Sequence, residues 1–252
     1  MPNNIEVIGV IPARYQSTRL PFKLTREILG KPLIQWVWEQ ARQARLLDKL
    51  LIACDDDKIK EIAESFGAEV MMTSAQHKSG TDRIGEAVRD IDIKIVVNIQ
   101  ADEPLLHPSI IDGLAQTLLS DSKVQIATVR KKIENKEEIN NYNVVKVICD
   151  KDNFAIYFSR HPIPYYRDNT NGVYYKHLGI YAYTKDFLYT FKNLPYSYLE
   201  HAEKLEQLRP LEAGYKIKVI ETRFESIGVD TESDLAKVEM ILKEKSIKNE
   251  KL

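Results

Sequence analysis

Short apolar runs alternate with amphipathic stretches through the first half of this chain. The runs have the length of strands, and the stretches between them repeat apolar residues at the spacing of one helical face. Strands that alternate with helices predict an α/β fold, a mainly parallel sheet with helices on both faces. We expect strands at 5–11, 50–53, 70–72, 94–99 and 124–129, and helices at 34–41, 59–66, 81–88 and 108–118.

The second half departs from this alternation. A strand is expected at 144–149, after which residues 154–183 carry a His-Pro-Ile-Pro run and seven tyrosines. Proline removes a backbone donor and disfavours helix at the residue before it, so this segment is predicted to be an extended, inserted β segment. We expect this segment to form a core hairpin, a wall of a substrate site or a subunit interface. Its aromatic content favours the interface.

Helical patterns return at 199–211 and 233–242, and Thr231 and Asp234 have the spacing of a capping box for the last helix. We find no internal repeat and no low-complexity linker. The chain is therefore interpreted as one domain over residues 1–242, with a charged tail at 243–252 that we expect to fray.

The composition excludes several classes of protein. A chain of 252 residues buries enough surface to need no disulfide, and Cys54 and Cys149 are expected to be reduced thiols. Thirty-six basic against 37 acidic residues argue against nucleic-acid binding, although a small phosphorylated ligand needs only a local cluster. The absence of a signal peptide and of a long apolar run predicts a cytoplasmic protein without membrane insertion.

A basic loop follows the first predicted strand directly. Ligands bind beyond the carboxyl ends of the strands in a parallel sheet, and this loop contains Ala13, Arg14, Arg19 and Lys23. Backbone amides and cations there suit a polyphosphate, whereas the alternative is a solvated loop. No Walker A loop and no Gly-x-Gly-x-x-Gly occurs, which excludes those two phosphate-binding signatures.

Two acidic residues are candidates for a metal site. Asp102 follows the fourth predicted strand, where a carboxylate facing the basic loop would hold a phosphate-bridging Mg²⁺, unless it merely caps a helix. Asp230 precedes the last helix, where it either satisfies helix amides or meets the same metal. The sequence leaves open whether the two converge.

The helix predicted at 81–88 begins with small polar residues. Ser79, Gly80 and Arg83 suit either the edge of a nucleobase or an anion, and the alternative is a plain helix cap. The five histidines lack the spacing of a zinc hydrolase, and no Gly-x-Ser-x-Gly elbow is present.

Taken together, these segments resemble the 3-deoxy-manno-octulosonate (Kdo) cytidylyltransferase family. The resemblance spans about residues 8–238, with seven motifs in the family's order. The motifs lie at 11–21, 77–83, 100–104, 157–160, 177–181, 205–209 and 229–231.

The resemblance implies a Rossmann-like nucleotidyltransferase fold and a homodimer formed partly through the later β segment. It also implies an activity, in which CTP and Kdo give CMP-Kdo and pyrophosphate with Mg²⁺ for lipopolysaccharide biosynthesis. By motif position, Arg14, Arg19 and Lys23 would contact the triphosphate of CTP, and Ser79, Gly80 and Arg83 would lie at its cytidine side. Ala13 and Gln100 would complete the CTP site, and Asp102 and Asp230 would hold the metal. The sugar would contact Gln100, Arg160, His177, Tyr181, Glu206 and Gln207.

The chain departs from the family pattern at two glycines. Phe22 follows Leu-Pro in the first loop and Ala101 precedes Asp102, where the family usually has glycine. If the first of these glycines has positive φ, Phe22 is strained. The alternatives are a cytidylyltransferase for 8-amino-Kdo or another acidic sugar, and a catalytically inactive nucleotide-binding regulator with Phe22 as the lesion.

Overall fold

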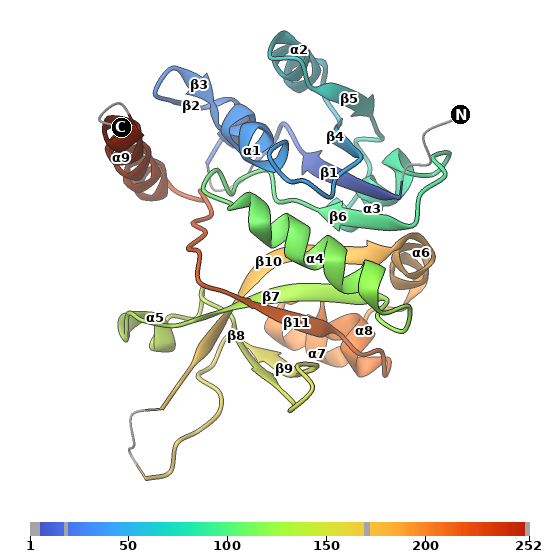
Figure 1. Cartoon of the computed structure of the whole chain (residues 1–252), viewed down its shortest axis with the longest axis vertical. Coiled ribbons are helices and arrows are strands. Elements are labelled where there is room, and N and C mark those ends of the chain that lie inside the picture. The colour runs from blue at the N-terminus through green and yellow to red at the C-terminus, as the bar shows by residue number, and fades with distance from the viewer. Residues whose placement is uncertain (1–5, 18–19, 169–171, 250–252) are drawn as a thin grey trace.

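The computed structural model, which describes residues 6–17, 20–168 and 172–249, is organised around one mixed sheet (Figure 1). The strands lie in the order β11-β7-β10-β6-β1-β4-β5, and β8 pairs with both β10 and β9. Their bounds are β1 Val7–Ala13, β4 Lys49–Cys54, β5 Glu69–Met72, β6 Ile95–Asn98, β7 Ile126–Lys132, β8 Lys146–Cys149, β9 Ala155–Ser159, β10 Tyr175–Thr184 and β11 Lys218–Thr222. A separate hairpin joins β2 Glu27–Ile28 to β3 Lys31–Pro32.

Helices cover both faces of the sheet, as the sequence predicts. Alternate residues of β1 point to opposite faces: Val7 and Ile11 join one core cluster, and Ile8 and Val10 join the other. The first cluster also contains apolar residues of α1 Leu33–Ala41, α2 Asp57–Ser65 and α4 Pro108–Ser120. The second contains those of α3 Gly80–Ala87, α6 Lys185–Asn193 and α8 Leu208–Glu212.

The segment at 154–183 is only partly an insertion. Its beginning forms β9 at one side of the sheet, but its end forms β10, which lies between β6 and β7 and runs antiparallel to both. Extended structure is therefore confirmed for the two strands, and β10 is a central strand of the main sheet. The proline-containing chain after β9 leaves the body at the bottom of Figure 1.

Two helix predictions need correction. The single helix expected at 199–211 is two short ones, α7 Tyr198–Glu203 and α8, because Lys204 adopts a left-handed conformation that ends α7. The last helix, α9 Glu232–Asn249, continues through most of the tail that was expected to fray. The capping box is confirmed, since Thr231 Oγ1 accepts from Asp234 N at 3.2 Å and Asp234 Oδ2 accepts from Thr231 N at 2.9 Å.

The carboxyl ends of β1, β4 and β6 meet at one edge of the sheet, because these strands are parallel and adjacent. The basic loop leaves β1 there, Asp55 follows β4, and residues 99–104 follow β6. The chain after β11 returns to the same edge before α9 begins. This edge is where the candidate site lies.

Candidate active site

Lys23 joins the two carboxylates that the sequence could not place together. Its Nζ donates to Asp102 Oδ2 at 2.5 Å and to Asp230 Oδ1 at 3.0 Å. Burial lowers the pKa of Lys23, but the two carboxylates outweigh it, so the net pKa lies above the ordinary value and the ammonium stays charged. Residues 23, 102 and 230, which are remote in the chain, thus converge on one point.

The turn before Lys23 has an unusual backbone. Phe22 has φ of 55° in the left-handed region, which favours glycine, and it precedes the short 3-10 helix Lys23–Thr25. Its half-exposed ring packs against Tyr15, with 4.8 Å between ring centroids. The ring therefore does not line the site, and Lys23 reaches the carboxylates despite the missing glycine. Ala101, at the other departure, is buried and has no positive φ.

A cavity of about 280 Å³ surrounds Lys23 at this edge. Its lining includes the predicted Arg14, Gly80, Arg83 and Gln100, together with Asp102 and Asp230. Arg19 lies outside the described residues. The side chain of Ala13 is fully buried in the core at the end of β1 and is not part of this lining, so its contact with CTP stays a prediction.

Arg83 is a fully buried cation on α3. Its guanidinium donates to Asp55 Oδ2 at 2.7 Å and to Thr73 Oγ1 at 2.6 Å, while its Nε has no hydrogen-bond partner among the described residues. A buried donor without a partner carries a desolvation cost, which an acceptor on a ligand in this cavity would remove. The sequence analysis did not identify Asp55 or Thr73, although the position of Asp55 directly after a strand was a usable signal.

The first residues of α3 cap the helix and bring it close to the end of β1. Ser79 Oγ accepts from Asp82 N at 3.1 Å, which confirms the plain cap. Ser79 lines a different cavity, of about 310 Å³, with Glu206 and Arg209. At Gly80, an added Cβ would lie 3.3 Å from Pro12 Cγ, so glycine allows the helix to approach the loop after β1.

A larger groove of about 1120 Å³ adjoins the first cavity. The two share Gln100, Asp102 and Asp230. All six residues that the resemblance assigns to a sugar line this groove: Gln100, Arg160, His177, Tyr181, Glu206 and Gln207. The groove with the predicted sugar residues therefore meets the cavity that contains Arg14, Lys23, Gly80 and Arg83 at the two carboxylates.

Several polar groups that line the groove are neutral, beside charged side chains such as Arg160, Lys176 and Glu206. Burial lowers the pKa of His177 to about 3, and its Nε2 lies 2.9 Å from Thr128 Oγ1. Burial raises the pKa of Tyr181, so both rings are uncharged near pH 7. The buried Nε2 of Gln207 has no partner among the described residues, and the Nε2 of Gln100 donates to Gly179 O at 2.9 Å. These neutral groups can form hydrogen bonds with the hydroxyl groups of a ligand.

The guanidinium of Arg160 is held by backbone oxygens at the edge of the groove. Its side chain donates to the backbone oxygens of Tyr142 at 3.0 Å, Glu203 at 2.7 Å and Lys204 at 3.4 Å. It therefore ties two walls of the groove together while its positive charge remains at the rim. Glu206 accepts from Thr81 Oγ1 at 3.2 Å, and burial raises the pKa of its carboxyl.

The donor set fits Mg²⁺ only together with a ligand. Among the described residues, no cluster of three or more histidine, cysteine or acidic side chains is arranged for a metal. Mg²⁺, however, usually takes one or two carboxylates plus phosphate oxygens and water. Asp102 and Asp230 share one ammonium, which shows that a cation is accommodated between them.

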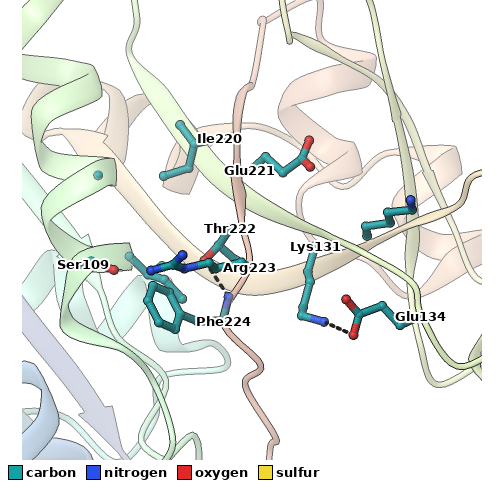
Figure 2. Close-up of a pocket in the computed structure, with 11 residues that line it drawn as sticks. Ser109, Lys131, Glu134, Ile220, Glu221, Thr222, Arg223 and Phe224 are labelled. Atoms are coloured by element: carbon teal, nitrogen blue, oxygen red, sulfur yellow. Dashed lines mark hydrogen bonds and ion pairs between the residues drawn. The ribbon is translucent and has the colours of Figure 1, made fainter.

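Another cavity, of about 580 Å³, lies between α4, β7 and β11 (Figure 2). It contains Lys131, Arg223 and Phe224 and shares no lining residue with the cavity or the groove described above. Lys131 there contacts Glu134 at 3.4 Å. This cavity is larger than the one around Lys23, but it contains none of the residues predicted for the reaction, so we do not assign the reaction to it.

Comparisons with known proteins agree with this geometry. A family model described as "Cytidylyltransferase" matches residues 8–219. The chain is 45% identical over 245 residues to a 3-deoxy-manno-octulosonate cytidylyltransferase of Geobacter metallireducens, with 93% of this chain and 96% of the relative covered. It is 47% identical to the protein of that name from Solibacter usitatus, with 94% and 95% covered.

A solved structure is similar over nearly the whole fold. It is a CMP:2-keto-3-deoxy-manno-octonic acid synthetase complexed with CTP, with a TM-score of 0.91 and 39% identity. The match covers 95% of this chain and 99% of that one. No helix in the described part of this chain is long and apolar enough to span a membrane.

Proposed function

Because the chain belongs to the cytidylyltransferase family, and within it to the 3-deoxy-manno-octulosonate cytidylyltransferases, we propose that it activates Kdo with CTP. The reaction gives CMP-Kdo and pyrophosphate for lipopolysaccharide biosynthesis. One observation carries the proposal: a cavity of about 280 Å³ and a groove of about 1120 Å³ meet at Asp102 and Asp230, with Lys23 between these carboxylates.

The smaller cavity is the proposed nucleotide site. Arg14 and Lys23 neutralise the triphosphate, with Arg19 proposed beside them from its motif position. Arg83, whose buried Nε has no partner among the described residues, lines this cavity, and Gly80 allows α3 to lie close to Pro12 in β1. Ser79 contributes by capping α3 rather than by lining this cavity.

Asp102 and Asp230 are the proposed holders of a divalent metal, specifically Mg²⁺. When bound to the phosphates, Mg²⁺ would supply neutralisation of the charge that develops on them. The chain's own part is to hold two carboxylates 2.5 and 3.0 Å from one cationic nitrogen, and therefore close to each other. Lys23, as a cation at the same point, is available to the phosphates.

The larger groove is the proposed sugar site. Tyr181, Gln207 and neutral His177 offer hydrogen bonds to hydroxyls, and Gln100 lies where the sugar would meet the nucleotide. Arg160 contributes positive charge for the sugar carboxylate, while its donors hold the walls. Glu206 lines the groove beside Gln207 as an acceptor.

The reaction needs positioning more than covalent chemistry. The anomeric hydroxyl of the sugar attacks the α-phosphorus, the new oxygen–phosphorus bond forms, and pyrophosphate leaves from the opposite side. Two anionic substrates repel each other at short range, so cations at their meeting point lower the cost of the encounter. Holding both in contact geometry supplies much of the remaining rate.

We also propose a cytoplasmic homodimer. Several large apolar or aromatic side chains near and within 154–183 are exposed: Tyr142 69%, Ile156 55%, Tyr165 87%, Tyr196 74% and Tyr198 77%. Exposed aromatic residues are typical of interfaces. Sedimentation at micromolar protein tests this, and a monomer would contradict it.

Pyrophosphate release by the purified protein tests the function. The assay combines Mg²⁺ with each of the four nucleoside triphosphates and a panel of Kdo, 8-amino-Kdo and a sialic acid. We expect release with CTP and Kdo. Release with another acidic sugar alone would reassign the substrate, and CTP binding without release from any sugar would favour the inactive regulator. The placement of Lys23 despite Phe22 speaks against that last outcome.

A further inference from the structure

Asp230 lies in a segment that cannot fix its own position. Residues 223–231, between β11 and α9, form no regular secondary structure and so lack the ladder of backbone hydrogen bonds that holds a strand or helix. Other contacts must hold the carboxylate of Asp230 opposite Asp102.

Three polar contacts attach this segment to the body of the protein, in addition to the Asp230–Lys23 ion pair, the stacking of Phe224 on His107 and the burial of Val229. Val229 N donates to Asp102 O at 2.9 Å, and Ser226 Oγ donates to Glu103 Oε2 at 2.6 Å. The third contact is made by Glu225, which accepts from Lys176 Nζ at 2.6 Å and pairs with Lys131 Nζ at 3.1 Å. The first two reach residues beside the metal site, and the third reaches the sheet itself.

The attachment through Glu225 has the strongest electrostatic character. Lys131 on β7 and Lys176 on β10 are only 5% and 6% exposed, so each needs a carboxylate nearby. Burial raises the pKa of Glu225, but the two ammonium groups outweigh it and the net pKa lies below the ordinary value. Glu225 is therefore ionised and bridges two adjacent strands.

We propose that Glu225, held by Lys131 and Lys176, is a positioning residue that fixes the segment 223–231 and thereby holds Asp230 in place for the metal–nucleotide complex. This inference rests on the proposed function of Asp230. It assigns a role, beyond lining the larger groove, to a carboxylate that none of the sequence motifs contains.

The Glu225→Gln variant tests the proposal without turnover. Calorimetry gives the affinity for CTP in excess Mg²⁺ and again in a chelator, and the ratio of the two is the gain due to metal. We expect this ratio to fall about tenfold, the lower range for loss of a contact that orients a metal ligand. The affinity in chelator should stay within about twofold, because the nucleotide contacts themselves are intact.

Two matched variants remove the same charge from the same lysines. Glu134 contacts Lys131 at 3.4 Å, and Glu138 on α5 Glu137–Asn140 contacts Lys176 at 2.9 Å, but neither belongs to the segment 223–231. Glu134→Gln and Glu138→Gln should leave the metal-dependent ratio unchanged. An equal fall in either would mean that lost charge, not positioning, is the cause, and would overturn the proposal.

A second variant covers the case in which Glu225→Gln does not fold. Ser226→Ala breaks only the contact to Glu103 and should lower the ratio by about threefold, in line with one lost hydrogen bond. An unchanged ratio in every folded variant of the segment overturns the inference alone. A wild-type protein with no metal-dependent gain, or with no pyrophosphate release, overturns the proposed function instead.

Discussion

The proposed nucleotide cavity and the proposed sugar groove share three residues but differ in their polar groups. Around the cavity, full charges contact one another directly, as Lys23 does with Asp102 and Asp230. The groove adds neutral groups such as His177 and Gln207 to charged side chains such as Arg160 and Glu206. We therefore expect nucleotide affinity to depend mainly on charge, and sugar affinity to depend also on hydrogen bonds between neutral groups.

This contrast sets the expected size of each effect. Charged contacts in a partly desolvated site contribute several kcal/mol, on the order of a hundredfold in rate when one is lost in a reaction that moves charge. A hydrogen bond between neutral groups contributes only about 0.5–1.5 kcal/mol. Substitutions in the cavity should therefore act on turnover, and those in the groove on sugar affinity.

Asp102→Asn and Asp230→Asn should have the largest effect. Each removes one carboxylate that contacts Lys23, and we expect turnover to fall by at least about a hundredfold, because charge on the phosphates is then poorly balanced. Pyrophosphate release measures it, with Asp152→Asn at an exposed ion pair as the control. Near-normal turnover in both variants would place the metal elsewhere and remove the basis of the contrast.

The charged half of this comparison was largely predictable from the sequence. Arg14 and Lys23 lie in the loop that leaves β1, Asp102 lies in the loop that leaves β6, and the ends of parallel strands must meet at one edge. Their chemistry is recognisable from residue type alone. What could not be predicted is that Asp230 reaches Lys23, because this depends on an irregular segment and on tertiary contacts such as that of Glu225.

The residues proposed to contact the sugar could be predicted only from the resemblance to a family. Nothing in the pattern around His177 shows that β10 runs antiparallel in the middle of the sheet, which is what brings it to the crevice. Buried lysines such as Lys131 and Lys176 have no sequence signal either, since an alternating strand pattern places lysine outside. The backbone partners of Arg160 likewise follow from the fold and not from its motif.

Gln207→Leu should have the next largest effect, and on the groove alone. We expect the KM for the sugar to rise about tenfold, the upper range for one hydrogen bond, with the KM for CTP unchanged. Stability should not fall, because Gln207 Nε2 has no partner to lose among the described residues. Steady-state kinetics and urea unfolding measure both, with Gln116→Leu on the exposed face of α4 as the control. Lost stability without a change in KM would show that Gln207 only packs.

The neutrality of His177 predicts a specific pH dependence. Its folded pKa of about 3 lies below the ordinary 6.5, so the unfolded chain takes up a proton that the folded one refuses. This contribution to stability is complete above pH 6.5 and is lost as the pH falls toward 3. The free energy of unfolding should therefore drop less between pH 7.5 and 5.5 in His177→Gln than in the wild type. A ring that titrates near pH 6 by NMR would make the groove a charged site.

Phe22→Gly should have the smallest effect and isolates the strained turn of the nucleotide cavity. The left-handed φ of 55° costs a residue with a side chain about 1 kcal/mol, which glycine avoids, but glycine loses more entropy on folding and loses the contact with Tyr15. We expect stability to change by less than about 1 kcal/mol and turnover to stay within about threefold, because Lys23 keeps its carboxylates.

Phe22→Ala is the control for this last prediction, because the difference in stability between the alanine and glycine variants shows whether the turn is strained. It removes the same ring but keeps the strain, so it should be less stable than Phe22→Gly by about 1 kcal/mol. At ordinary backbone positions the order is reversed, since alanine loses less entropy than glycine. Urea unfolding of both variants therefore reports the conformation of this turn. An alanine variant at least as stable as the glycine variant would mean that the turn is not left-handed, and that Lys23 reaches its carboxylates by another path.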